Sequence, residues 1–245
     1  MGGKFVVFSH GRAGTNFLMN NLAAHPDTNV YMEPFHNKIS DRSQVNGRKW
    51  KEGESSANFA YSEVFSDDSR VSGFKLFYFH CRQSVVSSDI WGALRDDADL
   101  KVIFLNRRNL LMKHLSDLRA QKSGVWHPTR ENFSVSQYGD VVDVTVDIPA
   151  LMRVMSDLYC GYHKVSEIFS NHQCFHMFFE DLAEDSDDIY GEVLDFLDLR
   201  SGEVVNKFKS GTLTKKTTRV TNGARVKEVV GSSIFSDFLE TCTVL

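Results

Sequence analysis

The stretch KFVVFSHGRAGTNFL, residues 4–18, decides the fold that we expect for this chain. Phe5–Phe8 is a short apolar run of the kind that forms a buried strand, and Asn16–Ala24 has the apolar spacing of a helix. Gly11 and Gly14, in the loop between them, let the backbone curl closely around a ligand. The N–H groups at a helix start lack intrahelical partners, so this loop is expected to bind an anion; an ordinary glycine-containing turn is the alternative.

The loop lacks the residues that nucleotide hydrolases use for magnesium-assisted phosphoryl transfer. The Walker A pattern GxxxxGK[ST] ends in a Lys and a Ser or Thr, and that pair is absent here. The next strand candidate, KVIFL, is followed by Asn106 where an acidic residue would support the metal. Arg12 supplies a fixed positive charge instead, and Thr15 and Asn16 offer a helix cap or side-chain hydrogen bonds. We therefore expect a loop that grips phosphate without a metal.

Short apolar runs and helical patterns alternate along the rest of the chain. Further strands are expected at Val30–Met32, Phe74–Phe79, Val102–Leu105 and Phe175–Phe179, and further helices over residues 110–118, 151–168 and 189–197. This alternation is typical of a parallel sheet that is covered on both faces. The predicted fold class is α/β, a P-loop-like three-layer fold with a central parallel sheet and helices on both faces.

One domain over residues 1–245 is expected from the length of the chain and its 42% of hydrophobic residues. Two polar or mixed stretches do not fit the strand and helix pattern, and we predict insertions or lids at about 37–72 and about 124–148. A basic C-terminal loop is predicted at about 207–225, around the run KFKSGTLTKKTTRV.

Composition excludes several classes of protein. A net charge of −4 argues against nucleic-acid binding through bulk charge. The four cysteines have no CxxC spacing, which favours reduced thiols over a disulfide framework or a metal site. Neither a signal peptide nor an apolar run of the roughly 18 residues needed to cross a membrane is visible. A cytoplasmic protein without stable membrane insertion is expected.

Two adjacent arginines follow the strand KVIFL, where a helix is expected to begin. Arg107 and Arg108 open the segment NRRNLLMKHLSDLRAQKSGVW, and Ser116 lies about two turns down the helix. Cations at a helix N-terminus are mildly unfavourable, so their presence there hints at a ligand. We expect their guanidinium groups at the carboxyl edge of the sheet, beside the first loop. An exposed basic pair at a helix start is the alternative.

Three segments together resemble the sulfotransferases that use 3′-phosphoadenosine-5′-phosphosulfate (PAPS). GRAGTNFL is similar to the family's loop for the 5′-phosphosulfate. The segment from Arg107 to Trp126 is similar to the family's Arg…Ser segment for the 3′-phosphate. FEDL, at Phe179–Leu182, with the later VLDFLDL, resembles the family's YEDL and FLGL segments. The resemblance runs from Phe5 to Leu199 and is closest to the bacterial carbohydrate branch, which includes the trehalose and Nod-factor types.

The resemblance implies a donor site. Arg12 faces the 5′-phosphate and the bridging oxygen, Phe17 lies near the adenine, and either Arg107 or Arg108 holds the 3′-phosphate with Ser116. The implied product is adenosine 3′,5′-bisphosphate (PAP), and no metal is required. The basic run KKTTR is either a late loop that closes on the nucleotide or a solvated loop. The expected donor-binding set is Gly11, Arg12, Ala13, Gly14, Thr15, Asn16, Phe17, Arg107, Arg108, Ser116, Lys215, Lys216 and Arg219.

Transfer to a hydroxyl requires a general base, and Glu33 is the first choice. VYMEPFH places it just past the second strand, at the expected ligand edge, and the carbohydrate branch carries an acidic residue in a similar stretch. His36 and His80 are rivals; His80 stands five residues after Lys75, a wider spacing than in cytosolic relatives. Lys75 is expected either to assist at the sulfuryl oxygens, with Arg12, or to extend to solvent.

The acceptor is expected to be a small molecule or a carbohydrate, with a glycolipid included. One or two of a set of aromatic residues are expected to stack on it: Trp50, Phe59, Tyr61, Trp126 and Tyr138. Two other functions stay open. One is a P-loop-like kinase or NTPase, which magnesium-dependent ATP turnover would reveal. The other is a nucleotide-binding module without catalysis. A homodimer is also open.

Overall fold

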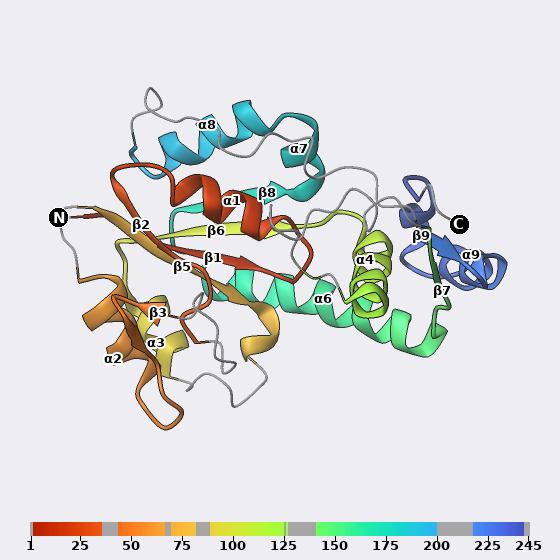
Figure 1. Cartoon of the computed structure of the whole chain (residues 1–245), viewed down its shortest axis with the longest axis horizontal. Coiled ribbons are helices and arrows are strands. Elements are labelled where there is room, and N and C mark those ends of the chain that lie inside the picture. The colour runs from red at the N-terminus through yellow and green to blue at the C-terminus, as the bar shows by residue number, and fades with distance from the viewer. Residues whose placement is uncertain are drawn as a thin grey trace. The chain divides into compact units, whose positions relative to one another are not determined.

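The computed structural model describes residues 2–35, 44–66, 70–81, 89–124, 126, 141–199 and 218–242 (Figure 1). Lys215, Lys216, His36 and Tyr138 lie outside the described residues. The chain forms two compact units. Unit 1 comprises Met1–Asn106 and Gly161–Thr212, and unit 2 comprises Arg107–Cys160 and Leu213–Leu245. The single domain that the sequence predicts stays a prediction.

Unit 1 is built on a parallel five-stranded sheet with the strand order β2-β5-β1-β6-β8. All five predicted strands are confirmed, with bounds shifted by a few residues. The strands are β1 (Lys4–Ser9), β2 (Thr28–Tyr31), β5 (Val71–Phe77), β6 (Leu100–Asn106) and β8 (Cys174–Phe178). Because β1 lies in the centre, the loop that follows it opens at the carboxyl edge of the sheet, where ligands bind in such folds.

Helices cover both faces of this sheet (Figure 1). On one face, Phe8 stacks on Trp91 of α3 (Asp89–Asp96) at 5.3 Å between ring centroids and contacts Phe169 at 4.9 Å. The other face carries α1 (Thr15–Leu22), whose Asn21 carbonyl accepts a hydrogen bond from Tyr190 of α8 (Ser186–Phe196) at 3.0 Å. The predicted α/β fold class, with a central parallel sheet and helices on both faces, is confirmed.

One close approach fixes the packing of the two central strands β1 and β5. Phe5 pairs with Gly73 in the parallel register, and the ring of Phe5 lies directly over that glycine. A Cβ atom added at Gly73 would meet three ring atoms of Phe5 at 2.4 to 2.5 Å, closer than real Cβ contacts. Only glycine fits at this position beside the present ring.

The described part of the predicted 37–72 insertion joins the core of unit 1. β3 (Gln44–Val45) and β4 (Arg48–Lys49) form a hairpin across Asn46 and Gly47, whose positive φ angles of 51° and 79° are those of a type I′ turn. α2 (Ser56–Phe59) continues into a π-helix, η2 (Ala60–Val64). Val45, Phe59, Ala60, Val64 and Phe65 are all buried in the main hydrophobic cluster. Whether this segment also covers a site stays a prediction.

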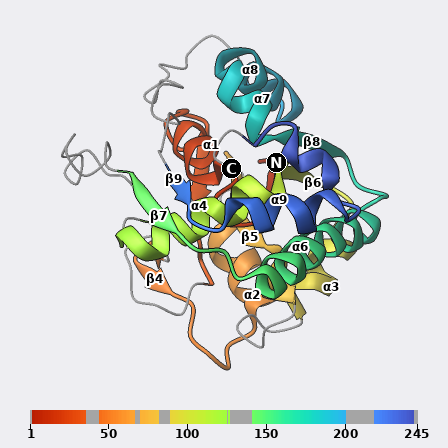
Figure 2. The ribbon, with the colours of Figure 1, turned by 90° about the vertical axis from the view of Figure 1, so that its right-hand side faces the viewer.

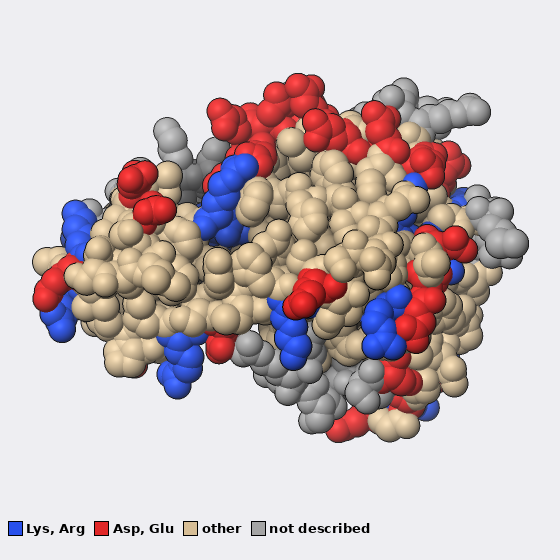
Figure 3. Space-filling model, turned by 180° about the vertical axis from the view of Figure 1, so that it is seen from behind, with Lys and Arg blue, Asp and Glu red and all other residues tan. Residues whose placement is uncertain are grey.

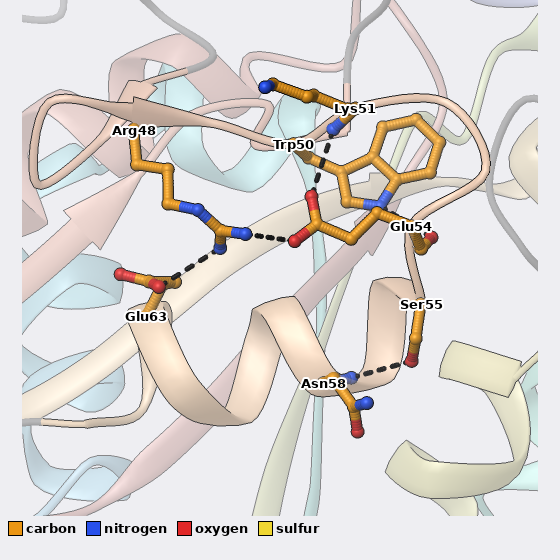
Figure 4. A network of polar contacts seen from close by, with 7 residues as sticks. All are labelled: Arg48, Trp50, Lys51, Glu54, Ser55, Asn58 and Glu63. Carbon is orange, nitrogen blue, oxygen red and sulfur yellow. Dashed lines mark hydrogen bonds and ion pairs between the residues drawn. The ribbon is translucent and has the colours of Figure 1, made fainter.

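Arg48 holds the hairpin to these helices (Figure 4). Its guanidinium forms ion pairs with Glu54 and with Glu63, the latter at 3.0 Å, and lies over the ring of Phe59 at 4.9 Å. The indole of Trp50 donates a hydrogen bond to the Glu54 carbonyl at 3.1 Å. These polar contacts explain why a stretch with so many hydrophilic residues is ordered.

Acidic side chains gather on α7 (Phe179–Glu184) and α8 (Figure 3). Residues 180–198 contain nine Asp or Glu and no Lys or Arg. Three of them serve α8 directly, because Asp185 caps its N-terminus by accepting from the Asp188 N–H at 3.2 Å, and Asp187 and Asp188 lie in its first turn. Carboxylates at a helix N-terminus stabilise the helix, which accounts for part of this charge.

Unit 2 combines helices with a small parallel sheet (Figure 2). Its elements are α4 (Leu110–Ser123), β7 (Val142–Val144), the first part of α6 (Ile148–Ile168), β9 (Thr218–Val220), α9 (Gly223–Gly231) and η5 (Ser236–Leu239). Asn109 caps α4 by accepting from the Met112 N–H at 2.9 Å, and its amide donates to the Phe238 carbonyl at 2.9 Å. The cap therefore also ties α4 to the C-terminal part of the unit.

The remaining element, η3 (Tyr78–Cys81), is a 3₁₀ turn directly after β5. In the described ranges, none of the helices combines the length and the apolar character that crossing a bilayer requires.

Candidate functional site

The loop between β1 and α1 has a left-handed backbone at two positions. Arg12 and Gly14 both have positive φ angles, of 70° and 79°. Gly14 is the N-cap of α1, and its carbonyl accepts from the N–H groups of Phe17 and Leu18 at 2.9 and 3.2 Å. The N-cap residue is a glycine, which has no side chain to cap the helix, so the predicted cap by Thr15 or Asn16 is wrong. The helix thus begins on backbone alone, with its positive end at the loop.

The two glycines of this loop have different surroundings. A Cβ atom at Gly14 would lie 2.9 Å from Cδ2 of Phe179, the first residue of α7, so this glycine is required by its φ angle and by packing. A Cβ atom at Gly11 would meet no described residue within 4 Å. The ring of Phe179 therefore packs against the loop at Gly14, whereas the described residues leave Gly11 open.

Three side chains meet around the ammonium of Lys75, in the middle of β5. Nζ forms an ion pair with Oε1 of Glu33 at 2.9 Å and donates a hydrogen bond to Oδ1 of Asn16 at 2.6 Å. It also lies 5.2 Å from the ring centroid of Phe77. Lys75 is only 2% exposed, so it does not extend to solvent. This set of residues, Lys75, Glu33 and Asn16, is called the Lys75 cluster below.

The fold explains why these residues meet. β2 and β5 are neighbours in the sheet, and Glu33 comes two residues after the end of β2. Asn16 lies in the first turn of α1, which covers the face of the sheet that Lys75 occupies. A buried ammonium is costly unless charge and hydrogen bonds compensate it, and here a carboxylate, an amide oxygen and an aromatic ring do so. The cluster joins the predicted base to the helix that begins at the loop.

His80 is buried at the end of the same segment and has a structural contact. Its Nδ1 accepts a hydrogen bond from the backbone N–H of Phe77 at 3.2 Å, and the residue is 4% exposed. An Nδ1 that accepts requires the proton on Nε2, and protonation of the ring would break this bond. His80 thus has a structural contact through Nδ1, and the choice between Glu33 and His80 as the base stays a prediction.

The second predicted anion site belongs to unit 2. Arg107 is half-buried and donates weakly to the Met112 carbonyl at 3.5 Å, Arg108 is exposed, and Ser116 is half-buried on α4. Whether these residues share a ligand with the loop of unit 1 stays a prediction.

Arg219 also lies in unit 2, on β9. Its guanidinium binds the carboxylate of Asp143 on β7 through two hydrogen bonds, of 2.7 and 2.5 Å. This contact lowers the pKa of the Asp143 carboxyl group from its ordinary value. Arg219 thus joins the two strands of the small sheet, and its predicted role at the nucleotide stays a prediction.

The remaining candidates differ in burial. Ala13 is fully buried, Thr15 is 5% exposed and Phe17 is 8% exposed, so these residues support the loop from within. Of the aromatic residues predicted to stack on an acceptor, Phe59 is in the core, and Tyr61 donates a hydrogen bond to Asp97 at 2.8 Å. Trp126 is exposed.

Two features were missed at the level of sequence. Asn16 as a partner of Lys75 depends on the docking of α1 onto β5, for which no local pattern exists. Phe79, a 46% exposed ring directly after β5, was counted only as part of a strand. A weak signal was available, because FKLFYFH places four aromatic residues within four positions of Lys75 at the expected ligand edge.

Comparisons with known proteins support the fold. No family model matches the chain, and no curated protein matches it in sequence. A sulfotransferase structure from Alicyclobacillus acidocaldarius is similar over 98% of this chain and 94% of that chain, with a TM-score of 0.52 and 13% identity. This chain therefore has the P-loop-like α/β fold of that sulfotransferase.

Two further solved structures are similar with lower TM-scores. A mouse sulfotransferase complexed with PAP is 12% identical, with a TM-score of 0.45 over 98% of this chain and 68% of that chain. A sulfotransferase domain from the curacin biosynthetic pathway is 13% identical, with a TM-score of 0.46 over 89% of this chain and 87% of that chain.

Proposed function

We propose that this protein is a sulfotransferase that moves a sulfuryl group from PAPS to an acceptor hydroxyl. The observation that carries the proposal is the Lys75 cluster, in which a buried ammonium bridges a carboxylate and the first turn of the helix that starts at the loop. The same site thus holds a candidate base, a buried cation and an anion-binding helix end. The likeness of the fold to a sulfotransferase structure supports this choice.

The loop residues suit the phosphate end of the donor. When bound, PAPS supplies an activated sulfuryl group whose leaving oxygen gains negative charge as its bond to sulfur breaks. The α1 N-terminus, the Arg12 guanidinium and the Lys75 ammonium stabilise that charge, and one such donor contributes about 10²–10³ in rate. Open space at Gly11 and the left-handed backbone at Arg12 and Gly14 fit a phosphate group in this position.

Glu33 is the general base in this proposal. Its carboxylate takes the proton of the acceptor hydroxyl while the acceptor oxygen forms its bond to sulfur on the side opposite the leaving oxygen. The electron pair of the broken bond stays on the leaving oxygen, and PAP is released. The ion pair with Lys75 orients Glu33 before the acceptor arrives.

The finer parts of the proposal rest on the resemblance in sequence. Arg107 or Arg108, with Ser116, binds the 3′-phosphate, and the acceptor is a carbohydrate or glycolipid. The basic run KKTTR is either a loop that closes on the nucleotide or a solvated loop. Cytoplasmic location, a homodimer and a reaction without a metal also stay predictions.

Calorimetric titration with PAP and with ATP plus magnesium tests the donor. We expect PAP to bind at least tenfold more tightly than ATP. Substitution of both Arg107 and Arg108 by alanine is expected to abolish this preference. Magnesium-dependent turnover of ATP would overturn the proposal in favour of a kinase or NTPase.

Glu33→Gln tests the chemistry. Transfer from ³⁵S-labelled PAPS to an acceptor mixture of phenols and sugars is expected to fall at least 100-fold, while PAP affinity changes less than threefold. Glu63→Gln is the matched control, because Glu63 is also an ion-paired carboxylate of unit 1 but lies in the Arg48 network. Tight PAP binding without transfer by the wild type would instead identify a nucleotide-binding module without catalysis.

A further inference from the structure

Phe79 is a large apolar side chain that is exposed beside the Lys75 cluster. It lies in η3, immediately after β5, and is 46% exposed. A single exposed hydrophobic residue on a protein surface needs no explanation. Phe79 differs because it belongs to a row of rings that leads from the surface to the buried ammonium.

The row is defined by three contacts. The rings of Phe79 and Phe77 are stacked, with centroids 5.4 Å apart and an interplanar angle of 22°. Phe79 also meets the ring of His80 edge-on at 4.5 Å. Phe77 in turn lies 5.2 Å from Nζ of Lys75. Two ring contacts hold Phe79 in place, so an apolar ligand that stacks on it need not order the side chain.

The position of this row matches the proposed chemistry. Phe79 follows the carboxyl end of β5, the edge at which open parallel sheets bind ligands. Glu33 follows the neighbouring strand at the same edge. The exposed ring of Phe79 is thus separated by the single ring of Phe77 from the Lys75 ammonium, which contacts the proposed base. Small-molecule sites commonly combine an apolar surface, which binds the ligand, with a few polar groups, which fix the ligand's orientation.

We propose that Phe79 determines acceptor specificity by stacking on the apolar face of a ring that carries the accepting hydroxyl. This inference rests on the proposed sulfotransferase function and adds a requirement for a cyclic acceptor. An arene and the C–H face of a pyranose offer the same chemistry to Phe79, so the experiment below includes both. Acyclic alcohols lack such a face and gain nothing from it.

Three probe acceptors test the inference: 4-nitrophenol, methyl β-D-glucopyranoside and 1-propanol. Transfer from labelled PAPS is measured for the wild type, Phe79→Ala and Phe79→Trp, and PAP affinity is measured by calorimetry. At least one ring acceptor is expected to have a lower KM than 1-propanol. Phe79→Ala should raise that KM about tenfold and change kcat less than about twofold, and Phe79→Trp should restore the KM. Whichever ring compound responds identifies the acceptor as an arene or a sugar.

The controls separate this inference from the proposed function. Ile234→Ala removes an 84% exposed side chain of unit 2 and should change neither KM nor PAP affinity. A KM that is unchanged in Phe79→Ala, or raised equally for 1-propanol, overturns the role of Phe79 and leaves the sulfotransferase proposal standing. PAP binding without transfer to either ring compound also overturns it. If the wild type binds no PAP and transfers to no probe, the proposed function fails, and this inference fails with it.

Discussion

The ion pair between Lys75 and Glu33 predicts an asymmetry in stability. Glu33→Gln leaves a nearly inaccessible ammonium without its counterion, whereas Lys75→Met removes the buried charge and leaves a carboxylate that is 15% exposed and can turn toward water. Breaking a buried pair costs roughly 3–5 kcal/mol when it strands a charge. Because Asn16 and Phe77 still face the ammonium, we expect about 3 kcal/mol for Glu33→Gln. For Lys75→Met we expect about 1 kcal/mol, since an apolar residue of similar size fills the space.

The double variant is the sharper test. Adding Lys75→Met to Glu33→Gln removes the stranded charge, so the double variant should be more stable than Glu33→Gln alone, by about 2 kcal/mol. The free energy of unfolding is measured by urea titration, and a loss of about 3 kcal/mol corresponds to a fall in Tm of roughly 6–12 °C for a chain of this size.

Tryptophan fluorescence can report the unfolding of unit 1 alone, the unit that contains the ion pair between Lys75 and Glu33. The chain has three tryptophans, and two of them, Trp50 and Trp91, pack against the core of unit 1. A Trp126→Phe background removes the third, which lies in unit 2. Additive costs, or a Lys75→Met variant that is less stable than Glu33→Gln, would refute the picture of a buried cation that depends on Glu33.

Three further outcomes are expected. Gly14→Ala and Gly47→Ala both place alanine at a φ of 79°, but only the first meets Phe179, so Gly14→Ala should be less stable by at least about 1 kcal/mol in thermal unfolding and should weaken PAP binding. Burial lowers the pKa of His114 below 6.5, so its contribution to stability is present above pH 6.5 and is lost as the pH falls through the lowered pKa; His114→Gln should flatten this dependence in urea titrations at pH 7.5 and 5.5. Asn21 is fully buried, and neither amide atom has a hydrogen-bond partner among the described residues, so Asn21→Leu should raise Tm, and a fall would show that the amide is satisfied.

The strands of the main sheet were predictable because each is a short apolar run bounded by polar residues or glycine. In a parallel sheet that is covered on both faces, both sides of a strand are buried, so such runs stand out without alternation. The loop was predictable for a similar reason, because its glycines stand where the backbone requires positive φ or open space. These are local properties of the chain.

The hairpin at residues 44–49 was missed although Asn46-Gly47 is a strong signal for a type I′ turn, because its strands are only two residues long. β7 and β9 have three residues each, and their paired residues are 76 positions apart in the chain, so no local pattern marks them. The Lys75 cluster joins residues from a helix, a strand and a loop. A lysine within an apolar run is a sequence signal for a buried charge. The partners of that lysine could not be predicted, because they depend on the order of the strands in the sheet.

The close approach of Phe5 and Gly73 has an evolutionary consequence. A larger residue at 73 requires a smaller one at 5, so among homologues a larger residue at 73 should occur only together with a smaller one at 5. Since Gly73 precedes Lys75 by only two residues, this steric lock also restricts drift in the strand that carries the proposed catalytic cation. An alignment that showed free variation at both positions would mean that the two strands can be spaced differently in relatives.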